Sequence, residues 1–344
     1  MRVLDLFSGA GGMSLGFSDA GFEVVAAADF WIDALETLKF NKPDTKTFHI
    51  DLSDSQEVEN MCNQVGKIDL VIGGPPCQGF SIAGKRDPSD PRNRLYQGFV
   101  GAIKILNPRA FVMENVPTIA SSTNIELFES IINDFVDLGY AITHKVLLAS
   151  DFGVPQNRRR MFIVGLRDSA TSFIFPTKMD TMVSTSEAIS DLPESSASDG
   201  APYGSSAQSA YQSQMRKGSR GLYNHQITQH SAQTIETIAL VPDGGNHKDL
   251  PLTKQGIRNV NIAWTRLNSA RPSYTIDTGH RHHFHYLWDR VPTVRESARL
   301  QSFPDQFVFF GSKTSQYKQV GNAVPPQLAR VIAVSLRNQI KEIG

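Results

Sequence analysis

The sequence predicts an α/β fold built on a doubly wound, mostly parallel sheet, with a second, smaller domain. In the first half of the chain, short apolar runs of strand length recur, and segments with apolar residues at helical spacing lie between them. Composition changes after about Lys178, because residues 184–214 are rich in Ser, Ala, Gly, Pro and Gln and show no periodicity. The first pattern indicates the sheet, and the second places a domain boundary near residue 184.

Seven apolar runs have the length of buried strands, and five segments between them have the length and periodicity of helices. The strands are expected at residues 3–7, 24–29, 48–50, 68–74, 110–116, 140–149 and 161–167. The helices are expected at residues 13–20, 32–40, 57–65, 95–106 and 125–138. Because strand and helix alternate, neighbouring strands should pair in parallel.

Charge and cysteine content exclude several classes of protein. The 34 Lys and Arg residues balance 34 Asp and Glu residues, which argues against a protein that coats nucleic acid or an anionic membrane through bulk charge. Two cysteines are too few for a disulfide framework or a four-cysteine zinc site, and they favour a reducing, cytoplasmic location. No run approaches the ~20 apolar residues of a membrane span. Neither a membrane nor a metal is therefore expected as a partner.

Positive charge is concentrated in the middle of the chain. Residues 204–300 contain 12 Lys and Arg against 6 Asp and Glu, a net charge of +6, and seven of the nine histidines. Any contact with nucleic acid is therefore expected to use this local region.

A glycine-rich turn, Ser8-Gly9-Ala10-Gly11-Gly12, connects the first expected strand to the first helix. Such a turn lets a nucleotide-like cofactor approach the backbone at a helix N-terminus. Ser14 stands where the dinucleotide fingerprint requires glycine or alanine, which weakens the interpretation as a pyrophosphate site. Asp29 ends the second strand, where a carboxylate can accept both hydroxyls of a ribose, and Asp51 could hold the adenine edge similarly.

Cys77 follows the fourth expected strand in the segment Gly73-Gly74-Pro75-Pro76-Cys77. Glycines permit a sharp exit from the strand and prolines fix φ, so the thiol should be held rigidly at the carboxyl edge of the sheet. This placement is typical of a nucleophile, which needs a local positive field to ionise. Cys62 shares a helical face with Val58, Met61 and Val65 and is predicted to be a core residue.

Glu114 and the arginine run at 158–160 add charged groups at two further strand ends. Burial of Glu114 would raise its pKa and let it protonate a ring nitrogen near neutral pH, although a structural carboxylate is the alternative. Alternation puts Arg158 and Arg160 on one face and Arg159 on the other. The first two are therefore expected to contact substrate or phosphate.

Together these segments resemble the cytosine-C5 DNA methyltransferases, in the order of that family. The six matching motifs are residues 5–12 (DLFSGAGG), 75–78 (PPCQ), 114–116 (ENV), 156–160 (QNRRR), 295–304 (RESARLQSFP) and 319–324 (QVGNAV). Any one alone is weak, but six in order are specific. Two positions depart from the pattern: Asp29 where many members have Glu, and the absence of a proline after the histidines at 282–285.

The resemblance implies a Rossmann-like, S-adenosylmethionine-dependent methyltransferase fold in three parts. These are a catalytic and cofactor-binding domain at residues 1–184, a target-recognition domain at 185–285, and a hinge and C-terminal segment at 286–344 that returns to the catalytic domain. It also implies double-stranded DNA as substrate, with the target cytosine flipped out of the duplex. A bacterial restriction-modification role, with a separate cognate endonuclease, is the corresponding expectation.

By the same resemblance, Cys77 attacks C6 of cytosine, Glu114 protonates N3, and Arg158 and Arg160 hold the nucleophile region and the flipped base. C5 then takes the methyl group and the cofactor becomes S-adenosylhomocysteine. The implied cofactor residues are Phe7, Ser8, Gly9, Gly11, Gly12, Asp29, Phe30, Asp51, Leu52, Pro75, Asn322 and Val324. The implied DNA contacts are Ser81, Lys85, Arg86 and Arg281.

Three alternatives compete with this interpretation. A tRNA cytosine methyltransferase on the same fold typically carries a Cys-Phe-Thr motif, but this chain has no cysteine after Cys77. An NAD(P)-dependent oxidoreductase conflicts with Ser14 and leaves Cys77 without a role. A DNA-binding module without chemistry is disfavoured because every expected catalytic residue is present. Methyl transfer from labelled cofactor would separate the three.

Overall fold

A computed structural model of the chain describes residues 1–76, 93–167, 172–255, 264–278 and 283–343. The chain forms two compact units. The first comprises residues 1–148, 159–178 and 328–344, and the second comprises residues 149–158 and 179–327. Each unit is therefore discontinuous in sequence, and both domain limits expected from the sequence, at 184/185 and 285/286, lie inside the second unit.

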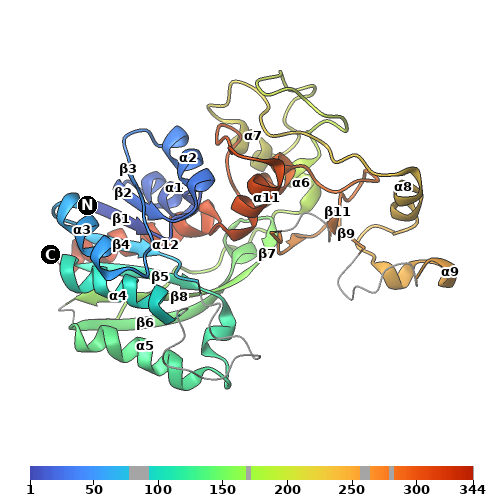
Figure 1. Cartoon of the computed structure of the whole chain (residues 1–344). Coiled ribbons are helices and arrows are strands. Elements are labelled where there is room, and N and C mark those ends of the chain that lie inside the picture. The colour runs from blue at the N-terminus through green and yellow to red at the C-terminus, as the bar shows by residue number, and fades with distance from the viewer. Residues whose placement is uncertain (77–92, 168–171, 256–263, 279–282, 344) are drawn as a thin grey trace. The chain divides into compact units, whose positions relative to one another are not determined.

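The first unit contains a seven-stranded sheet with the order β3-β2-β1-β4-β5-β8-β6 (Figure 1). Its strands are β1 (Arg2–Leu6), β2 (Glu23–Asp29), β3 (Lys46–His49), β4 (Leu70–Gly73), β5 (Ala110–Asn115), β6 (Tyr140–Leu148) and β8 (Arg159–Arg167). The pairs among β1 to β5 are parallel, whereas β8 runs antiparallel to both β5 and β6. The seven expected strands and the mostly parallel sheet are confirmed.

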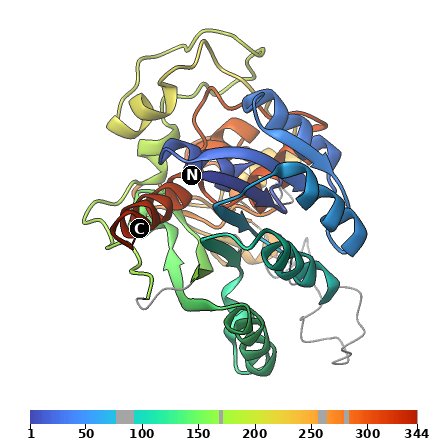
Figure 2. The same ribbon diagram turned by 90° about the vertical axis from the view of Figure 1, so that its left-hand side faces the viewer.

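Helices cover both faces of this sheet (Figures 1 and 2). They are α1 (Gly12–Asp19), α2 (Ile32–Asn41), α3 (Ser55–Val65), α4 (Asn93–Leu106), α5 (Ile125–Asp137) and α12 (Pro326–Ile343), with a short 3-10 helix η2 (Pro117–Ala120). Side chains alternate along each strand, so Leu4 and Leu6 of β1 face the apolar core under α3, α4 and α5. Asp5 points to the opposite face, where it contacts α1. This alternation decides which strand residues can reach the glycine turn.

The second unit consists of short elements joined by long loops. They are η3 (Ala149–Phe152), β7 (Gln156–Asn157), α6 (Thr185–Ile189), α7 (Ala210–Arg216), α8 (Ala232–Ala239), η4 (His247–Asp249), α9 (Leu252–Gln255), β9 (Thr265–Arg266), β10 (Ser273–Tyr274), β11 (His283–Phe284), α10 (Val294–Leu300) and α11 (Lys313–Asn322). Two capping boxes begin α6 and α10, with Ser184 and Glu187 in the first and Thr293 and Glu296 in the second. Local hydrogen bonds thus define helices too short to form alone.

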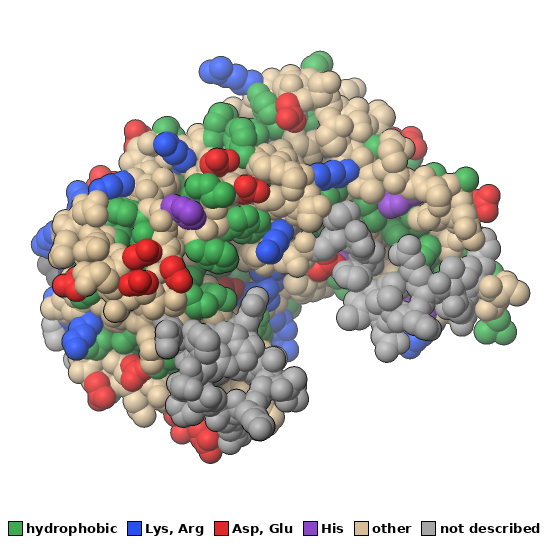
Figure 3. All heavy atoms as spheres, in the orientation of Figure 1, with side chains coloured by type: hydrophobic (Ala, Val, Ile, Leu, Met, Phe, Trp, Pro, Cys, Tyr) green, Lys and Arg blue, Asp and Glu red, His purple; other side chains and the backbone are tan. Residues whose placement is uncertain are grey.

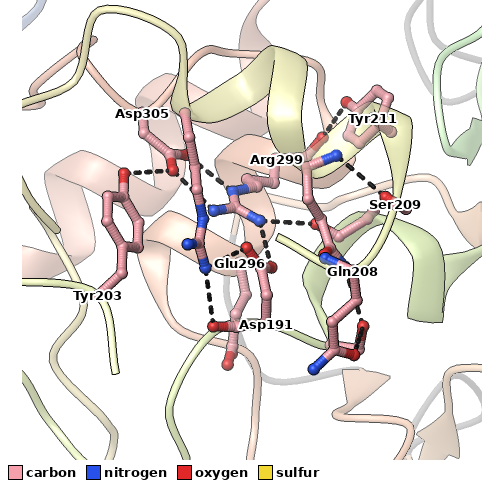
Figure 4. A network of polar contacts seen from close by, with 12 residues as sticks. Asp191, Tyr203, Gln208, Ser209, Tyr211, Glu296, Arg299 and Asp305 are labelled. Atoms are coloured by element: carbon pink, nitrogen blue, oxygen red, sulfur yellow. Dashed lines mark hydrogen bonds and ion pairs between the residues drawn. The ribbon is translucent and has the colours of Figure 1, made fainter. Parts of the chain in front are cut away.

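Buried ion pairs organise the interior of the second unit. Arg299 of α10 donates from Nε and Nη2 to the two carboxylate oxygens of Asp305, at 2.8 and 2.7 Å, and from Nη1 to Asp191 at 2.5 Å (Figure 4). Tyr203 donates its hydroxyl hydrogen to Asp305 at 2.6 Å. Because all three charges are fully buried, removing one partner would leave another uncompensated, so the network specifies one arrangement of these loops.

Candidate cofactor and catalytic site

The glycine turn folds sharply between β1 and α1 of the first unit. Phe7, Gly9 and Gly11 all have positive φ, at 55°, 52° and 91°. The positive φ of Gly11 favours glycine there, and a Cβ would also lie 3.1 Å from the side chain of Leu38 of α2, which would have to shift slightly. For Phe7, a bulky residue, the left-handed conformation is strained, and such strain is typical of ligand-binding turns.

Asp29 joins the turn to the end of β2. Its two carboxylate oxygens accept the backbone N–H of Gly9 at 2.7 Å and that of Trp31 at 2.9 Å. Burial raises the pKa of Asp29, while these two hydrogen bonds lower it. The backbone of Phe30 also donates a hydrogen bond to this carboxylate, which offers about four acceptor positions in total, so it can still accept a donor such as a ribose hydroxyl.

An exposed aromatic ring follows this acid. Phe30 is 69% exposed, although it is a large apolar side chain, and its carbonyl lies 2.9 Å from Nε2 of His49. The exposed ring therefore belongs to the residue that directly follows Asp29 in the chain. An exposed ring of this kind suits stacking against a planar base.

The segment after β3 lies against α4. Asp51 is exposed, and its Oδ1 accepts the N–H of Ser53 at 2.9 Å, while Leu52 is buried. A Cβ on Gly98 of α4 would lie 1.8 Å from the carbonyl oxygen of Leu52, which is impossible. Gly98 therefore lets α4 support the backbone of the Asp51-Leu52 segment directly.

Glu114 forms the second part of the site, at the end of β5. Its Oε1 accepts Nε of Arg160 on the neighbouring strand β8 at 2.8 Å. A Cβ on Gly74 would lie 3.1 Å from Oε2 of Glu114, so the carboxyl group lies over the start of the Gly74-Pro75 segment. Asn115 is buried and donates from Nδ2 to the carbonyl of Pro75 at 3.0 Å. Glu114 is thus held close to the segment that leads to Cys77.

Cys77, Ser81, Lys85, Arg86 and Arg281 lie outside the residues that the structure describes. The prediction for Cys62 is confirmed, because its side chain is 4% exposed within the core below the sheet. Burial raises the pKa of the Cys62 thiol to about 11, so it stays protonated at neutral pH.

Arg158 belongs to the second unit, whereas Arg160 belongs to the first. Arg158 is 1% exposed, and its guanidinium donates to the carbonyls of Gly321 at 2.9 Å and Asn322 at 3.5 Å. The two arginines therefore have different partners, although the sequence placed them on one face. Asn322 is exposed and Val324 is buried, and both also belong to the second unit.

Several residues that support the site were not among the residues expected from the sequence to contact a ligand. Asp5, Ser14, Asn115 and Gly98 each fix a backbone segment that includes an expected site residue. Asp5 could have been noticed, because an acid between two apolar strand residues needs a buried partner. Gly98 gives no sequence signal, since a helical glycine does not reveal what approaches it.

The basic residues of the middle segment are partly internal. Arg216, Arg266, Arg290 and Arg299 each form an ion pair with a carboxylate, and Arg295 is fully buried. Arg216 and Arg299 pair with Asp191 and Asp305, which lie outside residues 204–300, so the net charge of +6 overstates the charge available to a phosphate backbone. On the face shown in Figure 3, basic and acidic side chains of the described residues are interspersed.

Among the described residues, no group of three or more His, Cys, Asp or Glu side chains could hold a metal ion. Within the same residues, no helix is long and apolar enough to cross a membrane.

A glycine turn at a helix N-terminus, beside an acid at the end of the second strand of a doubly wound sheet, defines an α/β protein with a nucleotide-type cofactor site. Comparison with known families adds that the model of the C-5 cytosine-specific DNA methylases matches residues 1–338. The chain therefore belongs to the C-5 cytosine-specific DNA methylase family. It is a DNA cytosine-5 methyltransferase that uses S-adenosylmethionine.

Individual relatives agree with this family. The chain is 39% identical over 339 residues to the type II methyltransferase M1.HphI of Haemophilus parahaemolyticus, covering 97% of this chain and 86% of the relative. It is 36% identical over 364 residues to M.DdeI of Desulfomicrobium norvegicum, covering 97% and 88%. A solved structure of a prophage-encoded DNA modification methyltransferase from E. coli has a TM-score of 0.80 and 29% identity, covering 99% of both chains. The Dnmt2 methyltransferase of S. pombe, at 17% identity and a TM-score of 0.62 over 100% and 99% of the two chains, shares the fold.

Proposed function

We propose that the glycine turn, Asp29, Phe30 and the Asp51-Leu52 segment form the S-adenosylmethionine site. The carboxylate of Asp29 suits a ribose hydroxyl, and the exposed ring of Phe30 suits the adenine face. Phe7, Ser8, Gly9, Gly11, Gly12 and Pro75 supply backbone around it, and Asn322 and Val324 are the proposed cofactor residues of the second unit. No metal takes part in this proposal.

We further propose that Cys77 is the nucleophile and Glu114 the proton donor. The observation that carries this proposal is the ion pair of Glu114 with Arg160, held over the Gly74-Pro75 segment. Arg160 fixes the orientation of the carboxyl group, which faces the segment that leads to Cys77. Arg158 acts through the backbone of Gly321 and Asn322, which makes it a positioning residue.

The chemistry requires a nucleophile because C5 of cytosine is unreactive until C6 carries an added group. The thiolate of Cys77 adds to C6 while Glu114 gives a proton to N3, and C5 gains enamine character. Bound S-adenosylmethionine supplies an electrophilic methyl group. A base then removes the C5 proton, and its electron pair forms the C5–C6 double bond as Cys77 leaves as thiolate. N3 returns its proton to Glu114, which restores the neutral base and the acid.

Fluorine at C5 of the target cytosine tests this chemistry, because it blocks the final proton loss. The wild-type chain with cofactor should form a DNA adduct that survives denaturation. Cys77→Ser should form none, because serine lacks a comparable anion near neutral pH. Cys62→Ser is the matched control and should still trap DNA. Methylation of an amino nitrogen in fluorine-free DNA, without trapping, would contradict the proposal.

We propose that the enzyme is the modification partner of a restriction-modification system and acts on a specific sequence in double-stranded DNA. Its relatives M1.HphI and M.DdeI are type II methyltransferases. A cognate endonuclease would then cut the same sequence when it is unmethylated. Ser81, Lys85, Arg86 and Arg281 are the proposed DNA contacts.

Sequence choice is proposed to lie in residues 185–285. Exchange of this segment with that of a relative of different specificity should transfer the recognised sequence. The exchange removes Asp191, the partner of Arg299, so a shorter exchange of residues 229–284 is the companion chimera. A folded, active chimera that keeps the original target would contradict this placement.

A further inference from the structure

Asp5 is an acid buried beneath the glycine turn. It lies in β1 between Leu4 and Leu6 and is 1% exposed. Its Oδ2 accepts both the hydroxyl of Ser14, at 2.6 Å, and the backbone N–H of Ser14, at 3.2 Å. Ser14 is the residue that breaks the dinucleotide fingerprint, and the structure shows what its side chain does instead.

Several backbone N–H groups of the turn already donate hydrogen bonds to acceptors within the protein. The N–H of Gly9 is bound by Asp29 and that of Ser14 by Asp5, while that of Gly11 donates to the carbonyl of Ser8 at 2.9 Å. In phosphate-binding turns, such groups point at the anion. Here two carboxylates take that place, so the positive end of α1 is opposed from inside the protein.

We propose that Asp5, oriented by Ser14 and reinforced by Asp29, makes the glycine turn selective for a positively charged ligand. The pair favours the sulfonium S-adenosylmethionine over its neutral product S-adenosylhomocysteine, and disfavours anionic nucleotides. Asp5 acts through its charge, and Ser14 is its positioning residue. This inference rests on the proposed cofactor site.

The titration of Asp5 makes the inference testable. Burial raises the pKa of Asp5 to about 7, aided by the charge of Asp29 and opposed by the hydrogen bonds of Ser14. β1 is paired with β2 and β4 and is in contact with α1, and among the described residues of these elements Asp29 is the charged group that acts on Asp5. His49 of β3 acts on Asp29 in turn. A bound cation stabilises the Asp5 carboxylate, so cation affinity should rise as pH rises through 7, whereas affinity for a neutral ligand should not.

The experiment measures the dissociation constants of S-adenosylmethionine and S-adenosylhomocysteine by calorimetry from pH 5.5 to 8. The preference is the dissociation constant of S-adenosylhomocysteine divided by that of S-adenosylmethionine. In the wild-type chain this ratio should rise with pH, by about ten-fold in total for each unit by which bound S-adenosylmethionine lowers the pKa of Asp5. Asp5→Asn should abolish the rise. Ser14→Ala removes a hydrogen bond that lowers this pKa, so its rise should move to higher pH. The two ligands also titrate in this pH range, but their own titration is the same for every variant and therefore cancels when the variants are compared.

Asp19→Asn is the matched control, because Asp19 ends the same helix α1 and also has a pKa raised by burial. It should behave like the wild type. A preference that does not change with pH, or one that rises equally in Asp5→Asn, overturns the inference. If Asp5→Asn does not fold, carbon NMR of labelled aspartate in the wild type measures the pKa of Asp5 directly. This pKa should fall when S-adenosylmethionine binds and should not change when S-adenosylhomocysteine binds. No binding of either ligand to the wild type would instead overturn the cofactor site.

Discussion

Asp29 serves the local fold and the proposed ligand with the same two oxygens. Its oxygens accept the backbone N–H groups of Gly9 and Trp31, so the acid closes the turn before any ligand arrives. A shorter side chain than the glutamate of many relatives is compatible with this arrangement, because the acid lies close enough to hold the turn itself. Pre-ordering of this kind reduces the entropy cost of binding.

Asp29→Ala should weaken S-adenosylmethionine binding ten-fold or more, because hydrogen bonds to a charged group contribute about 1.5–3 kcal/mol. Asp29→Asn keeps one acceptor oxygen and should lose less. Calorimetry measures both variants, and Asp44→Ala, an exposed acid after α2, is the control. DNA affinity should not change. Unaltered cofactor affinity in Asp29→Ala would remove this residue from the site.

Arg158 and Arg160, two residues apart in the chain, have different partners and different roles. Arg160 neutralises and orients Glu114, while Arg158 ties the segment around β7 to the carbonyls of the closing motif. Arg158 lies between β7 and β8, so the alternation that was expected to place it on one face with Arg160 does not apply to it. The partners of these arginines are therefore set by the tertiary structure and not by the local pattern.

Helix α4 connects the proposed cofactor site to the core. Phe99 packs in a cluster with Phe111 of β5 and Phe135 of α5, with ring centroids 6.0 and 6.2 Å from it, while Gly98 contacts Leu52. The same helix thus holds the sheet on one side and the Asp51-Leu52 backbone on the other. A shift of α4 would be transmitted to that backbone.

Gly98→Ala should displace Leu52 or α4, because the added methyl group would lie 1.8 Å from the Leu52 carbonyl. Overpacking of this kind typically costs about 1–3 kcal/mol of stability, and cofactor affinity should fall with it. Gly101→Ala is the matched control in the same helix, since nothing lies within 4 Å of the added Cβ. It should gain up to about 1 kcal/mol from helix propensity. Urea unfolding and calorimetry test both, and equal behaviour of the two variants would refute the proposed contact.

The two units of the molecule should respond to acid in opposite ways. Burial lowers the pKa of His285 to about 4 and also lowers those of His225 and His230, all in the second unit. Folding there keeps histidines neutral, so the unfolded chain takes up protons first as pH falls below 6.5. The first unit contains Asp5, whose pKa is raised to about 7. Its buried charge destabilises the folded state above pH 7, and this free-energy cost decreases as the pH falls below 7 and the group is protonated.

We therefore expect His285 alone to cost the second unit up to about 1.4 kcal/mol per pH unit between pH 6.5 and 4, and His225 and His230 to act in the same direction. Trp264 and Trp288 lie in this unit, so tryptophan fluorescence in a Trp31→Phe background reports its urea unfolding. Nδ1 of His285 accepts the N–H groups of Leu287 and Trp288, and an asparagine oxygen can replace it. His285→Asn should reduce the pH dependence. A midpoint that stays constant from pH 7 to 5 would show that these histidines do not govern stability.

The local sequence pattern is sufficient to predict most strands and helices of the first unit and to indicate the family. Apolar runs with period two and apolar faces with period 3.6 report burial within a few residues, so strands such as β1 and helices such as α5 can be predicted from neighbouring residues alone. The order of six short motifs is likewise a property of the linear chain, and it is enough to indicate a cytosine-C5 methyltransferase. The same periodicity correctly places Cys62 in the core.

Other features depend on partners far apart in the chain, and only the folded molecule decides them. Arg299 meets Asp191 across 108 positions, which turns part of an expected basic surface into an interior network. The reversed direction of β8, the contact of Gly98 with Leu52 and the pairing of Asp5 with Ser14 are also set by how elements pack. A linear pattern records that a side chain is buried, but the group that satisfies it is chosen by three-dimensional proximity, because a buried charge takes whichever partner the packing brings within hydrogen-bond distance.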